Sequence, residues 1–306
     1  MDVQDGTNLP VRVDSGTQSR LARKAGSDAE LVSLWLRGKS ANTAEAYRRD
    51  VGQFFETFEG SLHYVRLDDL WDWHDRLRAD GLTTASIARK MAALKSLFSF
   101  GHRIGVLSVN VGAAFSLPKV PSQLSERILT EDETQALLTD ENSKRNTVLL
   151  RLFYASGARV SELTKLRWSA VRPRRNSAGQ ITLFGKGSKV RNVLLSDRVW
   201  EVLSTLWAAE KAEGFGNPDD PVFRSARGGG LSRQQMWRIV RGAARRAGLS
   251  QNVSPHWLRH AHASHALDRG APVHLVKETL GHESLATTSK YAHARPDDSS
   301  GRYLDI

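Results

Sequence analysis

Histidine, arginine and tyrosine recur within one short stretch near the C-terminus of the sequence. The residues concerned are His256, Arg259, His260, His282 and Tyr291. A tyrosine hydroxyl can serve as an oxygen nucleophile, an arginine fork binds a phosphate through two hydrogen bonds, and imidazoles move protons near neutral pH. Together these residue types predict chemistry at a phosphodiester, and none of them requires a metal ion.

Two upstream segments carry further cations that suit the same chemistry. Arg159 follows a Ser-Gly turn at an expected helix start, where unpaired N–H groups and the helix dipole favour an anion. The alternative is a surface arginine paired with Glu162, and this segment alone does not choose between them. Lys186 lies at the expected tip of a hairpin and could donate a proton to a leaving oxygen, although lysines in glycine-flanked turns are more often simply solvated.

Tyr291 needs help to act as a nucleophile, because a tyrosine hydroxyl ionises only at a pH near ~10. Nearby arginines and histidines would supply a cationic pocket, whereas Tyr303 has no such neighbours. The spacing of His256 and Arg259 puts both on one helix face. His256 and His260 are four residues apart, as in a zinc-protease helix, but the middle glutamate of that motif is absent, so no metal is expected.

Charge and composition indicate an acidic macromolecular partner. The formal net charge is +11 and the pI is about 10.1, which favours a nucleic acid or an anionic membrane surface. No apolar run approaches the ~20 residues that span a bilayer, and the polar N-terminus lacks the apolar core of a signal peptide, so we expect a cytoplasmic, nucleoid-associated protein. The absence of cysteine excludes disulfides, thiolate catalysis and cysteine-ligated zinc.

A basic amphipathic helix favours DNA over a membrane. Residues 232–248 place arginines along one helical stripe, with Trp237, Val240 and Ala244 at apolar positions. The apolar side chains provide only modest bulk, which makes a lipid surface the weaker interpretation. The predicted DNA-binding residues are Arg233, Gln234, Arg238, Arg241 and Arg245.

Apolar periodicity and composition predict two domains. We expect a flexible leader over 1–25, a helical domain over 26–115, a linker over 116–124 and a catalytic domain over 125–306 that ends in a short tail. The spacing predicts four helices in the first domain: a helical pair over 29–58, a third helix over 67–79 and a fourth over 84–101.

The second domain combines helices with a hairpin. The patterns predict helices over 131–138, 147–155 and 161–168, a hairpin over 180–195, and helices again from Ser232 onward, including one between Pro272 and Gly281. Ser232 with Gln235 fits a capping box. The basic residues Arg172, Arg174 and Arg175 are expected in a solvated loop or at phosphates.

Read together, five segments resemble the signature of the tyrosine recombinases, also called phage-type integrases, and most closely the Xer branch. They are Ala158–Leu163, Gly185–Gly187, His256–His260, Leu280–His282 and Tyr291. Each segment alone is weak or moderate, but five in this order and spacing are very improbable by chance. The resemblance covers roughly residues 27 to 295, including Ser40–Asp50, which is similar to the core-binding domain of the family.

The resemblance implies a mainly α fold with a small β-hairpin or sheet. A four-helix, SAM-like core-binding domain and an α+β catalytic domain would form a C-shaped clamp on duplex DNA. The partners implied are an inverted-repeat DNA site and a tetramer, built from this chain alone or with a sister recombinase. The biological role implied is chromosome-dimer resolution or mobile-element integration.

The resemblance also implies a role for each site residue. Tyr291 would attack the scissile phosphate and leave a 3′-phosphotyrosyl bond, as in type IB topoisomerases. Arg159 and Arg259 would bind the non-bridging oxygens, and Lys186 would protonate the leaving 5′-oxygen. His256 would act as general acid/base, His282 would hydrogen-bond the phosphate, and Glu162 would orient the other groups. Neither ATP nor a metal is implied.

Two departures from the family pattern are visible. Asn110-Val111 stands where relatives often have Asn-Pro, and only 292–306 follow the tyrosine, so docking of the tail on a neighbouring protomer is a hypothesis. Two other functions share parts of the pattern. One is a non-catalytic DNA-binding or regulatory protein, which would not need Tyr291, and the other is a topoisomerase that relaxes DNA without strand exchange.

Overall fold

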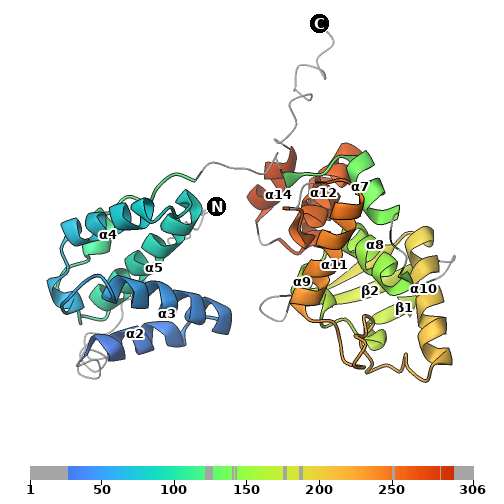
Figure 1. Ribbon diagram of the computed structural model, residues 1–306, viewed down its shortest axis with the longest axis horizontal. Coiled ribbons are helices and arrows are strands. Elements are labelled where there is room, and N and C mark those ends of the chain that lie inside the picture. The colour runs from blue at the N-terminus through green and yellow to red at the C-terminus, as the bar shows by residue number, and fades with distance from the viewer. Residues whose placement is uncertain are drawn as a thin grey trace, which may run out of the picture. The chain divides into compact units, whose positions relative to one another are not determined.

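The structure is a computed structural model that describes residues 27–120, 127–139, 141, 143–174, 178–185, 189–249, 252–282 and 284–292. The chain separates into two compact units that divide between residues 121 and 122 (Figure 1). Within the described part of the chain, no helix is long and apolar enough to cross a membrane.

The first unit is helical, as predicted. Its elements are α2 (Asp28–Arg37), α3 (Ala41–Phe55), the 3-10 turn η1 (Leu62–Tyr64), α4 (Leu67–Ala79), α5 (Thr84–Arg103) and the short α6 (Val111–Ala114). Side-chain oxygens of Ser27, Ser40 and Thr83 cap the first turns of α2, α3 and α5. The four predicted helices are therefore confirmed, and α6 is an addition that the sequence did not predict.

Helix α5 forms the centre of the first unit. It packs against α2, α3, α4 and α6, and its side chains Met91, Leu94, Leu97 and Phe98 are fully buried. The i, i+3 and i+4 spacing of these side chains explains how one helix contacts several others.

A buried ion pair joins α3 to α5 at the edge of this core. The carboxylate of Asp50 is 2% exposed and accepts hydrogen bonds from Lys90 Nζ at 3.2 Å and from Arg89. Lys90 is itself buried and also contacts Gln53 Oε1. Removing one member of a buried pair strands the other charge away from water.

Replacing Asp50 with alanine is therefore expected to lower the free energy of unfolding by about 3 kcal/mol, because Lys90 loses its counter-ion in the interior. Chemical denaturation of the full chain, followed by tryptophan fluorescence, measures the change. Asp72→Ala, at an exposed position on α4, is the matched control. Equal stability of the two variants would contradict the energetic role assigned to the Asp50 pair.

The second unit contains helices and one small sheet. Its elements are α7 (Glu131–Thr139), α8 (Lys144–Ser156), α9 (Val160–Leu163), the 3-10 turn η3 (Trp168–Ala170), β1 (Val171–Pro173), β2 (Gly179–Phe184), β3 (Val190–Leu195), α10 (Asp197–Ala212), α11 (Arg233–Arg246), α12 (Pro255–Asp268), α13 (Val273–Leu280) and α14 (Leu285–Ala292). The predicted hairpin strands, the capping box of Ser232 and Gln235, and the helix between Pro272 and Gly281 are confirmed.

Two predictions for this unit were wrong, and one helix was missed. The helix expected over 161–168 ends at Leu163, because Leu166 accepts the N–H of Val222 and draws the chain into a bridge with another segment. Helix α10 was not predicted, although its side chains at Leu203 and Leu206 are buried. Arg172 lies in a third strand, β1, rather than in a loop.

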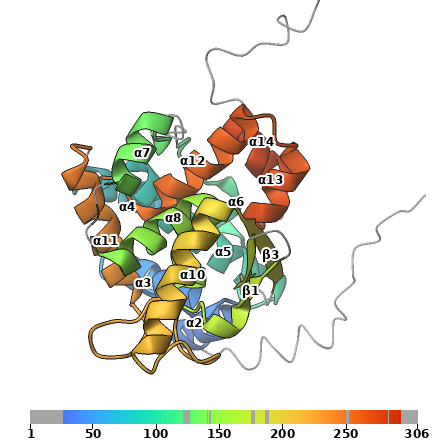
Figure 2. The same cartoon turned by 90° about the vertical axis from the view of Figure 1, so that its right-hand side faces the viewer.

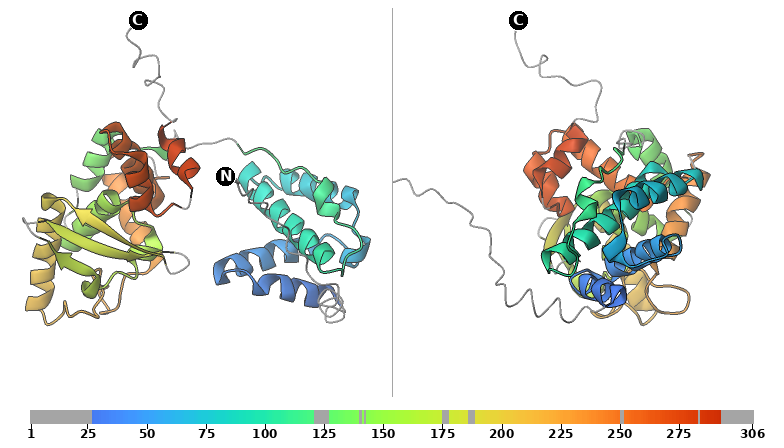
Figure 3. Two further views of the ribbon diagram at one scale, coloured as in Figure 1. Left: turned by 180° about the vertical axis from the view of Figure 1, so that it is seen from behind. Right: turned by 90° about the vertical axis from the view of Figure 1, so that its left-hand side faces the viewer.

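The sheet has the order β1-β2-β3 with both pairs antiparallel. Its side chains alternate, with Ile181, Leu183, Val193 and Leu195 buried. Helices α8 and α10 lie on one side of the strands (Figures 2 and 3). A Cβ atom at Gly179 would lie 1.9 Å from Trp200 Cε3, so glycine lets α10 approach the sheet closely.

Helix α12 runs through the second unit and touches most of the elements that carry the predicted site residues. It packs against α8, α13 and α14. Its N-terminal half carries His256, Arg259 and His260. The site is therefore assembled around one helix.

Candidate active site

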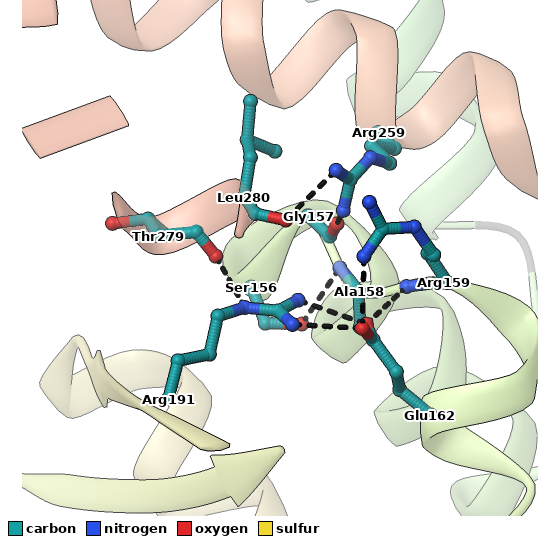
Figure 4. A network of polar contacts seen from close by, with 9 residues as sticks. All are labelled: Ser156, Gly157, Ala158, Arg159, Glu162, Arg191, Arg259, Thr279 and Leu280. Atoms are coloured by element: carbon teal, nitrogen blue, oxygen red, sulfur yellow. Dashed lines mark hydrogen bonds and ion pairs between the residues drawn. The ribbon is translucent and has the colours of Figure 1, made fainter. Parts of the chain in front are cut away.

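Glu162 organises the N-terminal side of the site. Its carboxylate is 1% exposed and accepts hydrogen bonds from the Arg159 backbone N–H at 2.7 Å and from Arg159 Nη1 at 3.1 Å (Figure 4). Arg191 donates to both carboxylate oxygens of Glu162, at 2.7 and 2.8 Å. Burial disfavours the Glu162 carboxylate, but these hydrogen bonds prevail and hold its pKa below its ordinary value.

Arg159 is held in place by Glu162 and keeps a side chain that is 35% exposed. The ion pair between Arg159 and Glu162, which the sequence left open as the alternative, is therefore present. It leaves part of the Arg159 guanidinium accessible to a ligand. The helix dipole at Arg159 is weaker than expected, because α9 is a single turn of four residues. The position of Arg159 depends on the carboxylate instead.

Arg259 lies on α12 and is 4% exposed. Its Nη1 donates to the carbonyl of Gly157 at 2.5 Å and its Nη2 donates to the carbonyl of Leu280 at 2.8 Å (Figure 4). Burial, followed by the charge of Arg159, lowers the pKa of Arg259 to about 10, so the guanidinium stays charged at pH 7.

The backbone conformation and the close packing at Gly157, whose carbonyl contacts Arg259, require a glycine. Its φ is +55°, in the left-handed region, and a Cβ atom there would lie 2.5 Å from Leu280 Cδ2. Glycine adopts that conformation without the steric cost of a side chain. The turn at the end of α8 can therefore present its carbonyl to Arg259.

Tyr291 lies on α14, 5% exposed, with two histidines around it. Its hydroxyl is 2.8 Å from Nδ1 of His260, and the ring of His282 stacks on its ring with centroids 6.3 Å apart. Burial raises the pKa of Tyr291 above its ordinary value, while the charges of Arg259 and Arg159 act in the opposite direction. The arginines thus partly offset the cost of forming a phenolate in this site.

His282 follows Gly281, which ends α13 with a left-handed φ of +66°. Its Nδ1 is 2.9 Å from Oγ1 of the buried Thr288, which orients the ring. Burial and the neighbouring arginines lower the pKa of His282 to about 4, so the ring is neutral at pH 7.

His256 and His260 lie one turn apart on α12, with ring centroids 6.5 Å apart. Loss of hydration, followed by the charges of Arg259 and Arg159, lowers the pKa of His256, although part of its side chain is exposed. Burial lowers the pKa of His260 to about 4. Among the described residues, no three histidine, aspartate or glutamate side chains are placed to hold a metal ion.

Two other histidines of α12 make structural contacts. His262 Nδ1 is 2.8 Å from the carbonyl of Tyr154. His265 is buried, with Nδ1 3.0 Å from the Tyr154 hydroxyl and Nε2 2.9 Å from the carbonyl of Leu129. These contacts join α12 to α8 and to the segment before α7.

Comparisons with known proteins agree with this arrangement. The phage integrase family matches residues 127–297, and the N-terminal SAM-like domain of phage integrases matches residues 31–105. The tyrosine recombinase XerD of Oceanobacillus iheyensis is 33% identical over 269 residues, 84% of this chain and 89% of that protein. The tyrosine recombinase XerC of Anoxybacillus flavithermus is 35% identical over 280 residues, 87% of this chain and 91% of that protein.

The chain belongs to the phage integrase family of tyrosine recombinases. A lambda integrase tetramer bound to a Holliday junction has the same fold, with a TM-score of 0.70 and 18% identity over 92% of this chain and 82% of that chain. The expected family, fold class and site-specific recombinase activity are confirmed.

The structure of the recombinase does not place every predicted site residue. Lys186, Tyr303 and Arg175 lie outside the described residues, as does the tail after Ala292. The strands β2 and β3 on either side of Lys186 are described, and they pair from Gly179 with Leu195 to Phe184 with Val190.

Helix α11 of the recombinase presents the predicted DNA-binding residues to solvent. All five are exposed: Arg233, Gln234, Arg238, Arg241 and Arg245. Arg238, Arg241 and Arg245 line a recess of about 320 Å³. The apolar assignment of Trp237 was wrong in part, because its side chain is 38% exposed and the Arg241 guanidinium lies over its ring at 5.9 Å.

Two side chains of the site were missed or undervalued in the sequence. The resemblance implied no role for His260, yet it contacts the Tyr291 hydroxyl directly. Arg191 was not considered at all. A signal existed for it, because Arg191 shares the inward face of β3 with Val193 and Leu195, and a charged residue on that face requires a partner.

Proposed function

We propose that this recombinase cleaves a DNA strand by attack of the Tyr291 hydroxyl on a scissile phosphate. The bond from Tyr291 Oη to phosphorus forms as the bond from phosphorus to the 5′-oxygen breaks. A 3′-phosphotyrosyl link and a free 5′-hydroxyl result, and the 5′-hydroxyl of a partner strand reverses the step. One phosphodiester is exchanged for another, so the chemistry needs no ATP.

The observation that carries this proposal is the convergence of Tyr291 with two arginines and a histidine from separate elements. Tyr291 comes from α14, Arg259 from α12, Arg159 from the start of α9 and His282 from the end of α13. The charges of Arg159 and Arg259 both act on the Tyr291 hydroxyl and on His282. Cations gathered around a nucleophile suit an anionic substrate.

Each residue has a role in the proposed step. Arg159 and Arg259 bind the non-bridging oxygens and stabilise the charge of the pentavalent transition state. His282 hydrogen-bonds the phosphate, and His256 acts as general acid/base. Lys186 protonates the leaving 5′-oxygen, and the Tyr291 proton leaves through the neighbouring imidazoles. Glu162 orients Arg159 without touching DNA.

The proposed partner is duplex DNA that carries inverted repeats around a short spacer. The exposed arginines of α11 supply the charge to contact phosphates and bases. The lambda integrase named above assembles as a tetramer on a Holliday junction, and we propose the same assembly here, from this chain alone or with a sister recombinase. Chromosome-dimer resolution and mobile-element integration are the proposed biological roles.

A nicked suicide substrate tests the reaction. The cognate site is first recovered by selecting DNA bound by the chain, and a nick is then placed next to the cleavage position so that the short fragment with the free 5′-hydroxyl diffuses away. We expect a covalent protein–DNA adduct that survives denaturing electrophoresis. Binding without an adduct would instead identify a non-catalytic DNA-binding protein, and relaxation of supercoils without recombinant product would identify a topoisomerase.

A further inference from the structure

Arg191 occupies a central place in the polar network of the second unit although the chemistry proposed above does not use it. It lies on β3, opposite Leu183 of β2, and its side chain is 12% exposed. Its guanidinium donates to both oxygens of Glu162, and its Nε donates to the carbonyl of Thr279 at 2.6 Å (Figure 4). The two parallel bonds to one carboxylate give this contact a fixed geometry.

Two glycines leave room for this arginine. A Cβ atom at Gly281 would lie 3.3 Å from Arg191 Nη1, at a position whose φ is +66°. A Cβ atom at Gly185 would lie 3.4 Å from Glu162 Oε1 and 3.9 Å from Arg191 Nη1. The backbone at Gly185 and at Gly281 therefore lies close to the Arg191–Glu162 pair.

Two arginines form hydrogen bonds to the C-terminal end of α13. The last carbonyls of a helix have no N–H partner within it. The N–H groups of Gly281 and His282 turn back to Glu278 and Lys277. The carbonyl of Thr279 instead accepts a hydrogen bond from Arg191, and the carbonyl of Leu280 accepts one from Arg259. Positive charge at a helix C-terminus is also favourable.

Arg191 therefore joins three segments that are distant in sequence. Through Glu162 it reaches Arg159 at the start of α9, and through Thr279 it reaches the turn that bears His282. Its own strand, β3, pairs with β2, with Leu183 opposite Arg191. Two groups that are proposed to contact one phosphate, Arg159 and His282, are thus linked through a single guanidinium.

We propose that Arg191 is a positioning residue for strand cleavage, which holds the Arg159 and His282 segments at a fixed separation without touching DNA. This inference rests on the proposed function. The expected contribution is geometric, because a misplacement of ~1 Å between reacting groups costs about 10²-fold in rate. A direct phosphate contact is the competing role, and the engagement of all three guanidinium nitrogens of Arg191 with Glu162 and the Thr279 carbonyl argues against it.

The test compares cleavage rates with DNA affinity in the full chain. Arg191→Met keeps the aliphatic stem and removes the fork. We expect the first-order rate of adduct formation at saturating suicide substrate to fall about 10²-fold, with Kd for the site unchanged within about threefold. Arg191→Lys keeps the charge but cannot make the bidentate contact, and it should lose at least about tenfold in rate.

Arg224→Met is the matched control. Arg224 makes a comparable ion pair with Glu210 and Glu213 on another part of the same unit, with an equal loss of charge on substitution. Its cleavage rate should stay within about twofold of the unmodified chain. If Arg191→Met fails to fold, the Arg191→Lys variant tests the proposal instead. A fall of about tenfold in its cleavage rate at unchanged Kd supports the proposal.

Three results would overturn the inference. They are cleavage by folded Arg191→Met at the unmodified rate, full rescue by Arg191→Lys, or a loss of affinity with no loss of rate, which would make Arg191 a DNA contact. The failure of the proposed function is distinct, because the unmodified chain itself would then form no adduct.

A double substitution tests whether Arg191 affects the cleavage rate through Glu162. Arg191→Met and Glu162→Gln should be non-additive in rate, since both disrupt the Arg191–Glu162 pair through which Arg191 is proposed to position Arg159. We expect the double variant to be no more than about threefold slower than the slower single variant. Multiplication of the two single effects would contradict positioning through Glu162.

Discussion

Tyr291→Phe is expected to abolish the covalent protein–DNA adduct, with a loss of at least about 10⁴-fold in the rate of cleavage. Phenylalanine keeps the ring that stacks on His282 and removes only the oxygen that forms the phosphotyrosyl bond. The phenylalanine side chain has no oxygen with which to attack phosphorus, so the phosphotyrosyl bond cannot form. Adduct formation on the suicide substrate is the measurement.

Binding separates this effect from a folding defect. The hydroxyl of Tyr291 contributes one hydrogen bond, to His260, so the phenylalanine variant should bind the same DNA with Kd within about threefold of the unmodified chain. Tyr303→Phe is the control and should form the adduct at the unmodified rate. An adduct that persists in Tyr291→Phe and disappears in Tyr303→Phe would move the nucleophile to the tail.

Arg259→Ala is the second large prediction, with an expected loss of about 10³-fold in the cleavage rate. Two causes add. The transition state loses a charged donor, and the carbonyls of Gly157 and Leu280 lose the group that holds them. Arg259→Lys restores the charge but has no planar fork, so we expect it to remain about 10²-fold below the unmodified chain. Single-turnover cleavage at saturating DNA measures both.

Arg269 provides the matched control for Arg259. It stands at the C-terminal end of the same helix, is 69% exposed and pairs with Glu131 on the surface. Arg269→Ala should change the cleavage rate by less than about twofold, because exposed ion pairs contribute little. Equal losses at both positions would show that α12 responds to substitution as a structural element, and Arg259 would lose its proposed role at the phosphate.

The helices that were predicted correctly are those whose signals are local. The helix expected over 67–79 is α4, with the same bounds, and the capping box of Ser232 and Gln235 opens α11. In both cases residues three or four apart decide the outcome. Helix α10 carried a comparable signal in the spacing of Leu203 and Leu206, so its omission was a failure of interpretation.

Errors of another kind had tertiary causes. The helix predicted over 161–168 has suitable residues throughout, yet it stops at Leu163 because Leu166 and Arg167 pair with the 221–222 segment. Strand β1 is three residues long and exists through its pairing with β2. The 221–222 segment is distant in sequence from Leu166 and Arg167, so no local pattern indicates that pairing, whereas β2 follows β1 directly and their hairpin was a local signal that was missed.

The sequence by itself determined the family and the class of reaction, because the side chains typical of the family occur in it in a recognisable order and spacing. Only the tertiary structure decided that His260 contacts the Tyr291 hydroxyl across 31 residues, and that Arg191 joins Glu162 and Thr279 across 29 and 88 residues. Such contacts depend on how α12, α13 and β3 pack against one another. Packing is set by the whole core, and no short window of sequence contains it.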